Sequence, residues 1–219
     1  MSDYDWVAPF ATGQGMDDWS HYGRPAETRL DHYFSGTLAL GHDFVLGDGV
    51  VANFNAGLKY TDVKWSGSGG SYIYSVDGFR DTVGTFPDDL RIIDYRQRYP
   101  AAFAGLDLSV VRDRWTFGFS AKGGLTFSAD DIDHHWRHQM RYNDKIKSAP
   151  TLSLGGRVEY ATANTLSLFV AATFDQVFKA RADTIEYDMA AGQTTAVYPD
   201  GAGADFRSAT LTIGLTKGF

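Results

Sequence analysis

The last eleven residues read Ala209-Thr-Leu-Thr-Ile-Gly-Leu-Thr-Lys-Gly-Phe219. Apolar side chains alternate with Thr and Gly along this stretch, which is the period-two pattern of a β-strand with one apolar and one polar face. Lys217 interrupts the apolar face near the end, where a long side chain can reach a membrane interface. Two interpretations of this segment stay open: an ordinary edge strand, or the closing strand of an outer-membrane barrel that ends on an aromatic residue.

The same alternation recurs in residues 52–58, 102–110, 115–119 and 152–160. Each of these segments has one apolar face, and its other face carries mainly Asn, Gly, Ser, Asp or charged residues. Arg157 and Glu159 would be costly in the core of a soluble β-sandwich, whereas they can meet in the polar lumen of a barrel. The repeated polar face therefore predicts an all-β fold, an antiparallel transmembrane β-barrel.

Composition excludes several other classes. The chain has 219 residues, no Cys, 24 Gly and 15% aromatic residues. Without Cys it is neither a disulfide scaffold nor a thiol enzyme nor a Cys-ligated zinc protein. The net charge of -7 argues against a nucleic-acid partner. No apolar run is long enough for a transmembrane helix, which leaves strands as the way to cross a membrane.

Connections between the alternating segments are expected to be short at one end and long at the other, as in bacterial barrels. The short ones are residues 111–114 and 162–164, and the long polar ones are residues 1–24, 66–94, 129–136 and 187–205. About seven strands are predicted, starting near Arg29, Val50, Tyr95, Trp115, Trp136, Thr165 and Phe206. Bacterial barrels have even strand numbers, and the opening residues resemble no signal peptide. We therefore expect an N-terminally shortened version of a longer barrel.

Three polar motifs lie in the expected loops. They are Asp3-Tyr-Asp-Trp6, then Gly69-Gly-Ser-Tyr-Ile-Tyr-Ser75 with Gly78-Phe-Arg-Asp81 and Phe86-Pro87, and finally Asp131-Ile-Asp-His-His135. Together they resemble the omptin family of outer-membrane endopeptidases, most densely over residues 69–147. The resemblance implies a ten-stranded barrel in the bacterial cell outer membrane, with catalytic loops facing the exterior. Residues 1–219 would form its single barrel domain, without the first three family strands and the signal peptide.

The resemblance also implies an aspartate-type endopeptidase, a hydrolase, and assigns its catalytic residues. Asp3 and Asp5 match the family's Asp pair, and Asp133 and His135 match its Asp-His pair. In an extended segment, residues two apart point to the same side, so both members of each pair can face one cleft. His135 can then take a proton from water, Asp133 can orient the imidazole, and the Asp pair can share a proton beside the tetrahedral intermediate.

A metal site was considered for His134, His135 and His138. The His-Glu-x-x-His pattern of zinc proteases is absent from the sequence, and loop histidines are usually free. No metal and no cofactor are therefore expected.

Substrate preference follows from charge, because a cleft lined with acids attracts basic peptides and proteins. Asp131 matches a family position that lines the pocket for the basic residue before the scissile bond, and dibasic sites are the expected substrates. His21 stands where the family commonly has an acid, which puts the preference after the scissile bond in doubt.

A lipid site is implied on the outer wall of the barrel. Tyr60, Asp62, Lys64 and Arg98 continue the lipid-facing positions of their strands and match the family's lipopolysaccharide site, with Lys147 as a fifth candidate that lies out of phase. Lipopolysaccharide is then the expected activating lipid. Two alternatives stay open: these residues form only an interfacial girdle, or the chain is a non-catalytic remnant or adhesive surface barrel.

Overall fold

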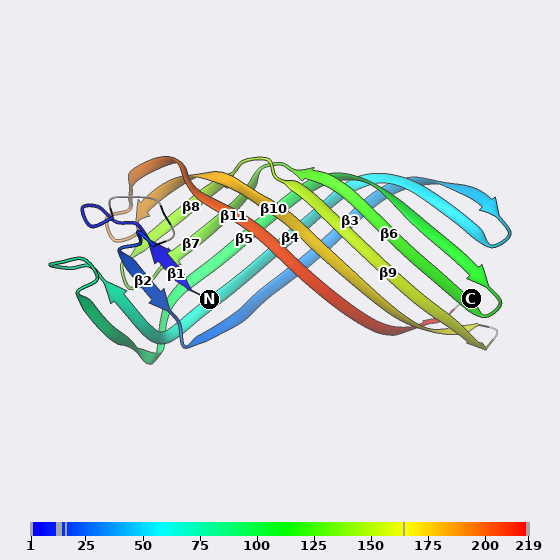
Figure 1. The fold of residues 1–219 in the computed structure, drawn as a ribbon, viewed down its shortest axis with the longest axis horizontal. Helices are drawn as coiled ribbons and strands as arrows, with labels where there is room; N and C mark the ends of the chain where they lie inside the picture. The colour runs from blue at the N-terminus through cyan, green and yellow to red at the C-terminus, as the bar shows by residue number, and fades with distance from the viewer. Residues whose placement is uncertain (1, 12–14, 16, 164, 218–219) are drawn as a thin grey trace.

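Eleven antiparallel β-strands form one curved sheet in the computed structural model, which describes residues 2–11, 15, 17–163 and 165–217 (Figure 1). The strands are β1 (Asp3–Asp5), β2 (His21–Arg24), β3 (Glu27–Gly47), β4 (Val50–Tyr74), β5 (Thr82–Arg112), β6 (Trp115–Thr126), β7 (Ala129–His135), β8 (Met140–Ile146), β9 (Pro150–Ala163), β10 (Leu166–Asp188) and β11 (Gln193–Lys217). In the described part of the chain, no helix is long and apolar enough to cross a membrane.

Seven of these strands form an up-and-down meander in the order β3-β4-β5-β6-β9-β10-β11. The meander confirms the prediction of an antiparallel all-β fold, and its seven strands match the predicted number. Strands β4, β5, β10 and β11 contain 25, 31, 23 and 25 residues. A strand needs only about 9–11 residues to cross a bilayer, so these four are much longer than a membrane crossing requires.

The faces of the meander follow the predicted alternation. Phe54 and Leu211 point outward and are 58% and 70% exposed, in positions that suit contact with lipid. On the inner face, Lys59 forms an ion pair with Asp175 and donates a second hydrogen bond to Ser153 at 3.1 Å. Arg157 and Glu159 also pair there, with Nε to Oε2 at 3.1 Å. These four inner charges are therefore neutralised in two pairs.

The short connections lie at one end of the sheet (Figure 1). Strands β5 and β6 are joined through Asp113, whose φ of 52° is the left-handed conformation of a tight turn, within the predicted connection 111–114. The second predicted short connection, 162–164, includes Asn164, which lies outside the described residues.

The long connections were predicted wrongly as loops. Residues 66–74 and 82–94 continue β4 and β5 as a hairpin, residues 129–135 are β7, and residues 193–205 belong to β11. Residues 3–5 and 21–24 are the short strands β1 and β2. The strand predicted near Trp136 begins instead at Pro150, and Trp136 lies in the β7–β8 turn. These segments are polar on both faces because they extend beyond the lipid, so alternation does not reveal them.

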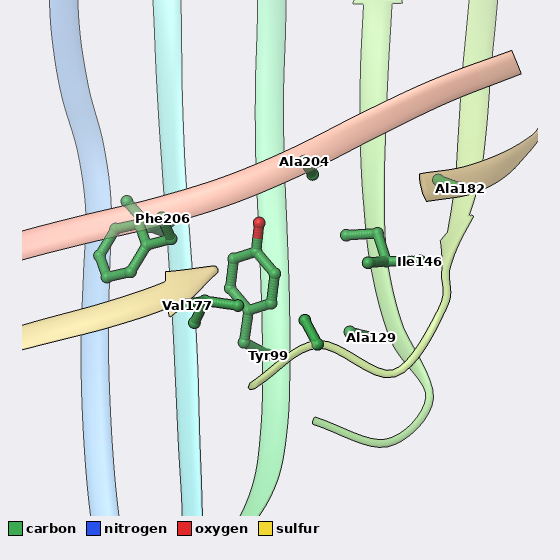
Figure 2. Packing of buried hydrophobic residues seen from close by; sticks show 9 residues of the cluster. Tyr99, Ala129, Ile146, Val177, Ala182, Ala204 and Phe206 are labelled. Carbon is green, nitrogen blue, oxygen red and sulfur yellow. The ribbon is translucent and has the colours of Figure 1, made fainter. Parts of the chain in front are cut away.

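The two outer strands of the meander approach each other without pairing. No ladder joins β3 to β11 among the described residues, yet Tyr33 of β3 stacks on Phe206 of β11 at 6.4 Å between ring centroids. Figure 2 shows Tyr99 of β5 reaching toward β11, and its hydroxyl donates to the Asp205 carbonyl at 3.3 Å. Tyr99 and Phe206 belong to a buried cluster that also contains Ala129 and Ile146, the first cross-strand pair of the β7–β8 hairpin.

Candidate active site

Four short strands gather at the end of the sheet opposite the tight turns (Figure 1). Strand β1 pairs with β2, which in turn pairs with the outermost part of β4. At Gly70, φ is 100° and an added Cβ would lie 2.0 Å from the Arg24 carbonyl oxygen, so the glycine lets β4 change partner from β3 to β2. The β7–β8 hairpin is inserted between β5 and β10. This framework carries the Asp pair on β1 and the Asp-His pair on β7.

The four predicted catalytic residues lie together. His135 Nε2 is 3.1 Å from Asp133 Oδ2 and 3.6 Å from Asp3 Oδ2. One ligand atom each of Asp3, Asp5 and His135 lies within 4.8 Å of the other two. Nε2 of His135 therefore faces a carboxylate on its own strand, β7, and a carboxylate on β1.

Burial and mutual charge shift the protonation of this group. Burial raises the pKa of Asp3 to about 6, and burial together with the charge of Asp3 raises the pKa of Asp5 to about 6. For His135, burial lowers the pKa, but the hydrogen bond to Asp133 and the charges of Asp133, Asp3 and Asp5 outweigh it and raise the pKa to about 10. Three acids thus surround one imidazolium, which leaves the site negative near neutral pH.

Aromatic and imidazole rings form the surroundings of the acids. Tyr74 lies 5.1 Å from the His21 ring and 5.7 Å from the His138 ring. Burial, then the charges of Asp5 and Asp3, raise the pKa of Tyr74 to about 12, so its hydroxyl stays protonated. His21 is also the cross-strand partner of Asp5. The side of the site next to Asp5 is therefore aromatic, and the imidazole of His21 stands where the sequence resemblance predicts an acid.

The histidines considered for a metal site are not grouped. His134 points to the other face of β7 and stacks on Trp136 at 5.0 Å. Among the residues that the structure describes, one group of three could hold a metal ion, and it consists of Asp3, Asp5 and His135. The absence of a metal from the reaction stays a prediction.

Asp131 lies below the four catalytic candidates, toward the membrane. It is 2% exposed and accepts a hydrogen bond from the Tyr95 hydroxyl at 2.8 Å. Its cross-strand neighbour in the hairpin is Asp144, which is 8% exposed. No sequence motif marked Asp144, because it stands in a mixed polar run without a recognisable pattern.

The predicted lipid-site residues of β4 and β5 lie on the outer wall. Asp62 and Arg98 are cross-strand partners, with Tyr60 and Lys64 at the neighbouring outward positions of β4. Each charged group already has a partner: Asp62 accepts two hydrogen bonds from Arg96, Lys64 Nζ lies 3.0 Å from Asp94, and Arg98 pairs with Asp130.

Lys147 contacts a different region. It pairs with Asp200 and lies 3.9 Å from Asp183, on β11 and β10. The structure therefore brings four of the five candidates together and gives Lys147 separate partners. Two basic residues that the sequence did not mark lie beside this group: Arg96 bonds Asp62, and Lys145 continues the row of Arg98 and Asp130 across the sheet. Lys145 stands two residues from Lys147, and only the register identifies it.

Comparison with solved structures identifies the fold as that of an outer-membrane barrel. The crystal structure of outer membrane protease OmpT from Escherichia coli matches with a TM-score of 0.85 at 24% identity. The match covers 100% of this chain and 73% of that chain.

Sequence comparison identifies the family. All of residues 1–219 match the model of the omptin family, and the chain belongs to that family. Outer membrane protease OmpP of Escherichia coli K12 is 24% identical, the plasminogen activator of Yersinia pestis 22%, and protease 7 of Escherichia coli O157:H7 27%. Each match covers 100% of this chain and 68% of the relative. These findings place the chain in the outer membrane and support a hydrolase that acts on peptide bonds.

Proposed function

We propose that the chain is an endopeptidase that cleaves next to basic residues, with dibasic sites as its substrates. In this mechanism the Asp133–His135 pair activates a water molecule opposite Asp3 and Asp5. The observation that carries the proposal is the meeting of these four side chains, which come from β1 and β7, strands far apart in the sequence.

The proposed steps assign one task to each group. The proton that His135 holds near neutral pH first passes to the Asp3–Asp5 pair. The neutral imidazole then takes the proton of the attacking water, Asp133 stabilises the imidazolium that forms, and that proton passes on to the leaving amine. Asp3 and Asp5, whose pKa values are raised to about 6, share a proton and donate it to the developing oxyanion. The mechanism needs neither a covalent intermediate nor a metal ion.

Water requires more room than the structure leaves between the two walls. A molecule that bridges two groups with hydrogen bonds of about 2.8 Å separates them by roughly 4.5–5.5 Å. The distance from His135 Nε2 to Asp3 Oδ2 is 3.6 Å. The productive state therefore has β1 and β7 farther apart, and we propose that substrate and lipopolysaccharide favour that state.

Lipopolysaccharide is proposed as the activating lipid, bound by the outer-wall group of Tyr60, Asp62, Lys64 and Arg98. Arg98 and Lys64 would exchange their present partners, Asp130 and Asp94, for lipid phosphates. Lys147 would join through a similar exchange with Asp200.

A fluorogenic peptide with two adjacent basic residues tests the proposed function. The protein refolded in micelles with lipopolysaccharide should cleave it and resist serine, thiol and chelating inhibitors. Loss of activity in EDTA that zinc restores would contradict the metal-free mechanism, with Asp3, Asp5 and His135 as the ligands. Absence of cleavage under all lipid conditions would favour a non-catalytic barrel.

A further inference from the structure

A second group of buried acids lies next to the proposed catalytic site. Residues Gln97, Asp131, Asp144 and Thr184 form one cross-strand row over β5, β7, β8 and β10. Two of its members are carboxylates in direct cross-strand register, and no basic residue belongs to the row.

The row contains polar atoms that receive no hydrogen bond. Asp131 Oδ1, Asp144 Oδ1 and Thr184 Oγ1 are buried, and no group of the described residues bonds to them. The second oxygen of Asp131 has a donor, the Tyr95 hydroxyl, which itself accepts from Gln97 at 2.9 Å. Buried oxygens of this kind are costly unless a donor reaches them.

We propose that Asp144 is the second carboxylate of the pocket for the basic side chain before the scissile bond, and that it binds this cation together with Asp131. The inference rests on the proposed function and adds a residue that determines specificity. Asp131 Oδ1 and Asp144 Oδ1 both lack a donor, and a guanidinium or ammonium group supplies several donors at once.

Position along β7 supports this role. Asp131 and Asp133 are two residues apart and share one face of the strand, which places the acid pair about 7 Å below the Asp-His pair. A Lys or Arg side chain extends over such a distance when its backbone lies at the reacting carbon. In the proposed arrangement, the basic side chain runs from the place where the chemistry occurs to the two acids.

The state without substrate is consistent with an ion site. Burial, then the charge of Asp144, raise the pKa of Asp131, so two ionised carboxylates side by side are unfavourable until a cation joins them. A cavity of about 400 Å³ borders Tyr95 and Gln97, with Thr28 of β3 and Gly203 of β11 on its other side. Open space thus adjoins the residues that support Asp131.

Two peptides that differ only in charge test the inference. One carries Arg before the scissile bond and the other carries citrulline, the neutral isostere of Arg. In Asp144→Asn, the amide nitrogen supplies a donor that Asp131 can accept, so we expect the hairpin to be retained. We expect kcat/KM for the Arg peptide to fall about 10- to 100-fold, the factor of one charged hydrogen bond, and kcat/KM for the citrulline peptide to change little. Asp107→Asn, which makes the same charge change in the lumen, should leave both values unchanged.

Each outcome decides the inference. An equal fall for both peptides would show a structural role for Asp144, and no fall for either would remove Asp144 from the pocket. Both results would overturn the inference while cleavage by the wild type upholds the proposed function. If the wild type cleaves neither peptide, the proposed function fails and the inference fails with it.

Discussion

The membrane-spanning part of the sheet differs in its charge pairing from the projecting end, which is the end that carries β1, β2 and the β7–β8 hairpin. In the spanning part, Lys59 pairs with Asp175 and Arg157 pairs with Glu159 on the inner face. At the projecting end, three acids meet the single imidazole of His135, and the row below it has two acids and no cation. Ion pairs stabilise the charged inner face of the sheet, whereas acids without a basic partner can bind a cationic ligand. The comparison separates residues that stabilise the protein from residues that act on a substrate.

The largest effect is expected at the projecting end. His135→Ala or Asp133→Asn should each lower kcat by at least two to three orders of magnitude, because a positioned base and its orienting group contribute that much. Cleavage of the fluorogenic peptide measures the loss. The matched control is His134→Ala, since this ring stacks on Trp136 on the other face of β7. A loss below tenfold for His135→Ala would remove His135 from the mechanism.

The spanning part should respond in stability instead of chemistry. Lys59→Met leaves Asp175 without its cation in a partly buried site, and we expect a loss of about 1–3 kcal/mol in the free energy of unfolding. Urea titration in micelles, followed by tryptophan fluorescence, measures it. Lys122→Met is the control, because Lys122 lies over the Phe103 ring at 5.4 Å. A change in kcat per folded molecule with unchanged stability would contradict the division between the two parts.

The dependence of stability on pH should also distinguish the two parts. The raised pKa values of Asp3 and Asp5, about 6 against 3.8, stabilise the folded end fully below pH 3.8, and this contribution is lost as pH rises through 6. The contribution of His135 is full below 6.5 and lost as pH rises through about 10. Hydrogen exchange of the β1 amides, corrected for intrinsic rates, should show protection that falls from pH 4 to pH 10. Protection that rises over this range would be incompatible with these shifts.

The smallest effect is expected on the outer wall. Replacing Lys64 and Arg98 together with Ala should raise the lipopolysaccharide concentration for half-activation severalfold and leave KM for the peptide nearly unchanged. Arg112→Ala, at the opposite end of the sheet where Arg112 bonds the Asp48 carbonyl, is the control. Full activity of lipid-free wild type would show that these residues form only an interfacial girdle.

Sequence reasoning predicted the spanning part better than the projecting end. Lipid requires one apolar face, so the segment from Ala52 to Leu58 reveals its strand by alternation alone. Residues of β7 and β8 meet polar surroundings on both faces, and their strands carry no such signal. Asp133 and His135 were found through a motif, whereas Asp144 depends on the register of a hairpin and Arg96 on a contact across strands. Such pairings exist only in the folded chain.

Cleavage-site mapping tests the central claim most directly. A peptide library with every residue equally represented on both sides of the scissile bond is digested by the wild type and by His135→Ala, and mass spectrometry identifies the cuts. The account predicts that wild-type cuts follow Lys or Arg and that His135→Ala gives none above background. Cuts spread without regard to charge, or cuts that persist in His135→Ala, would contradict it.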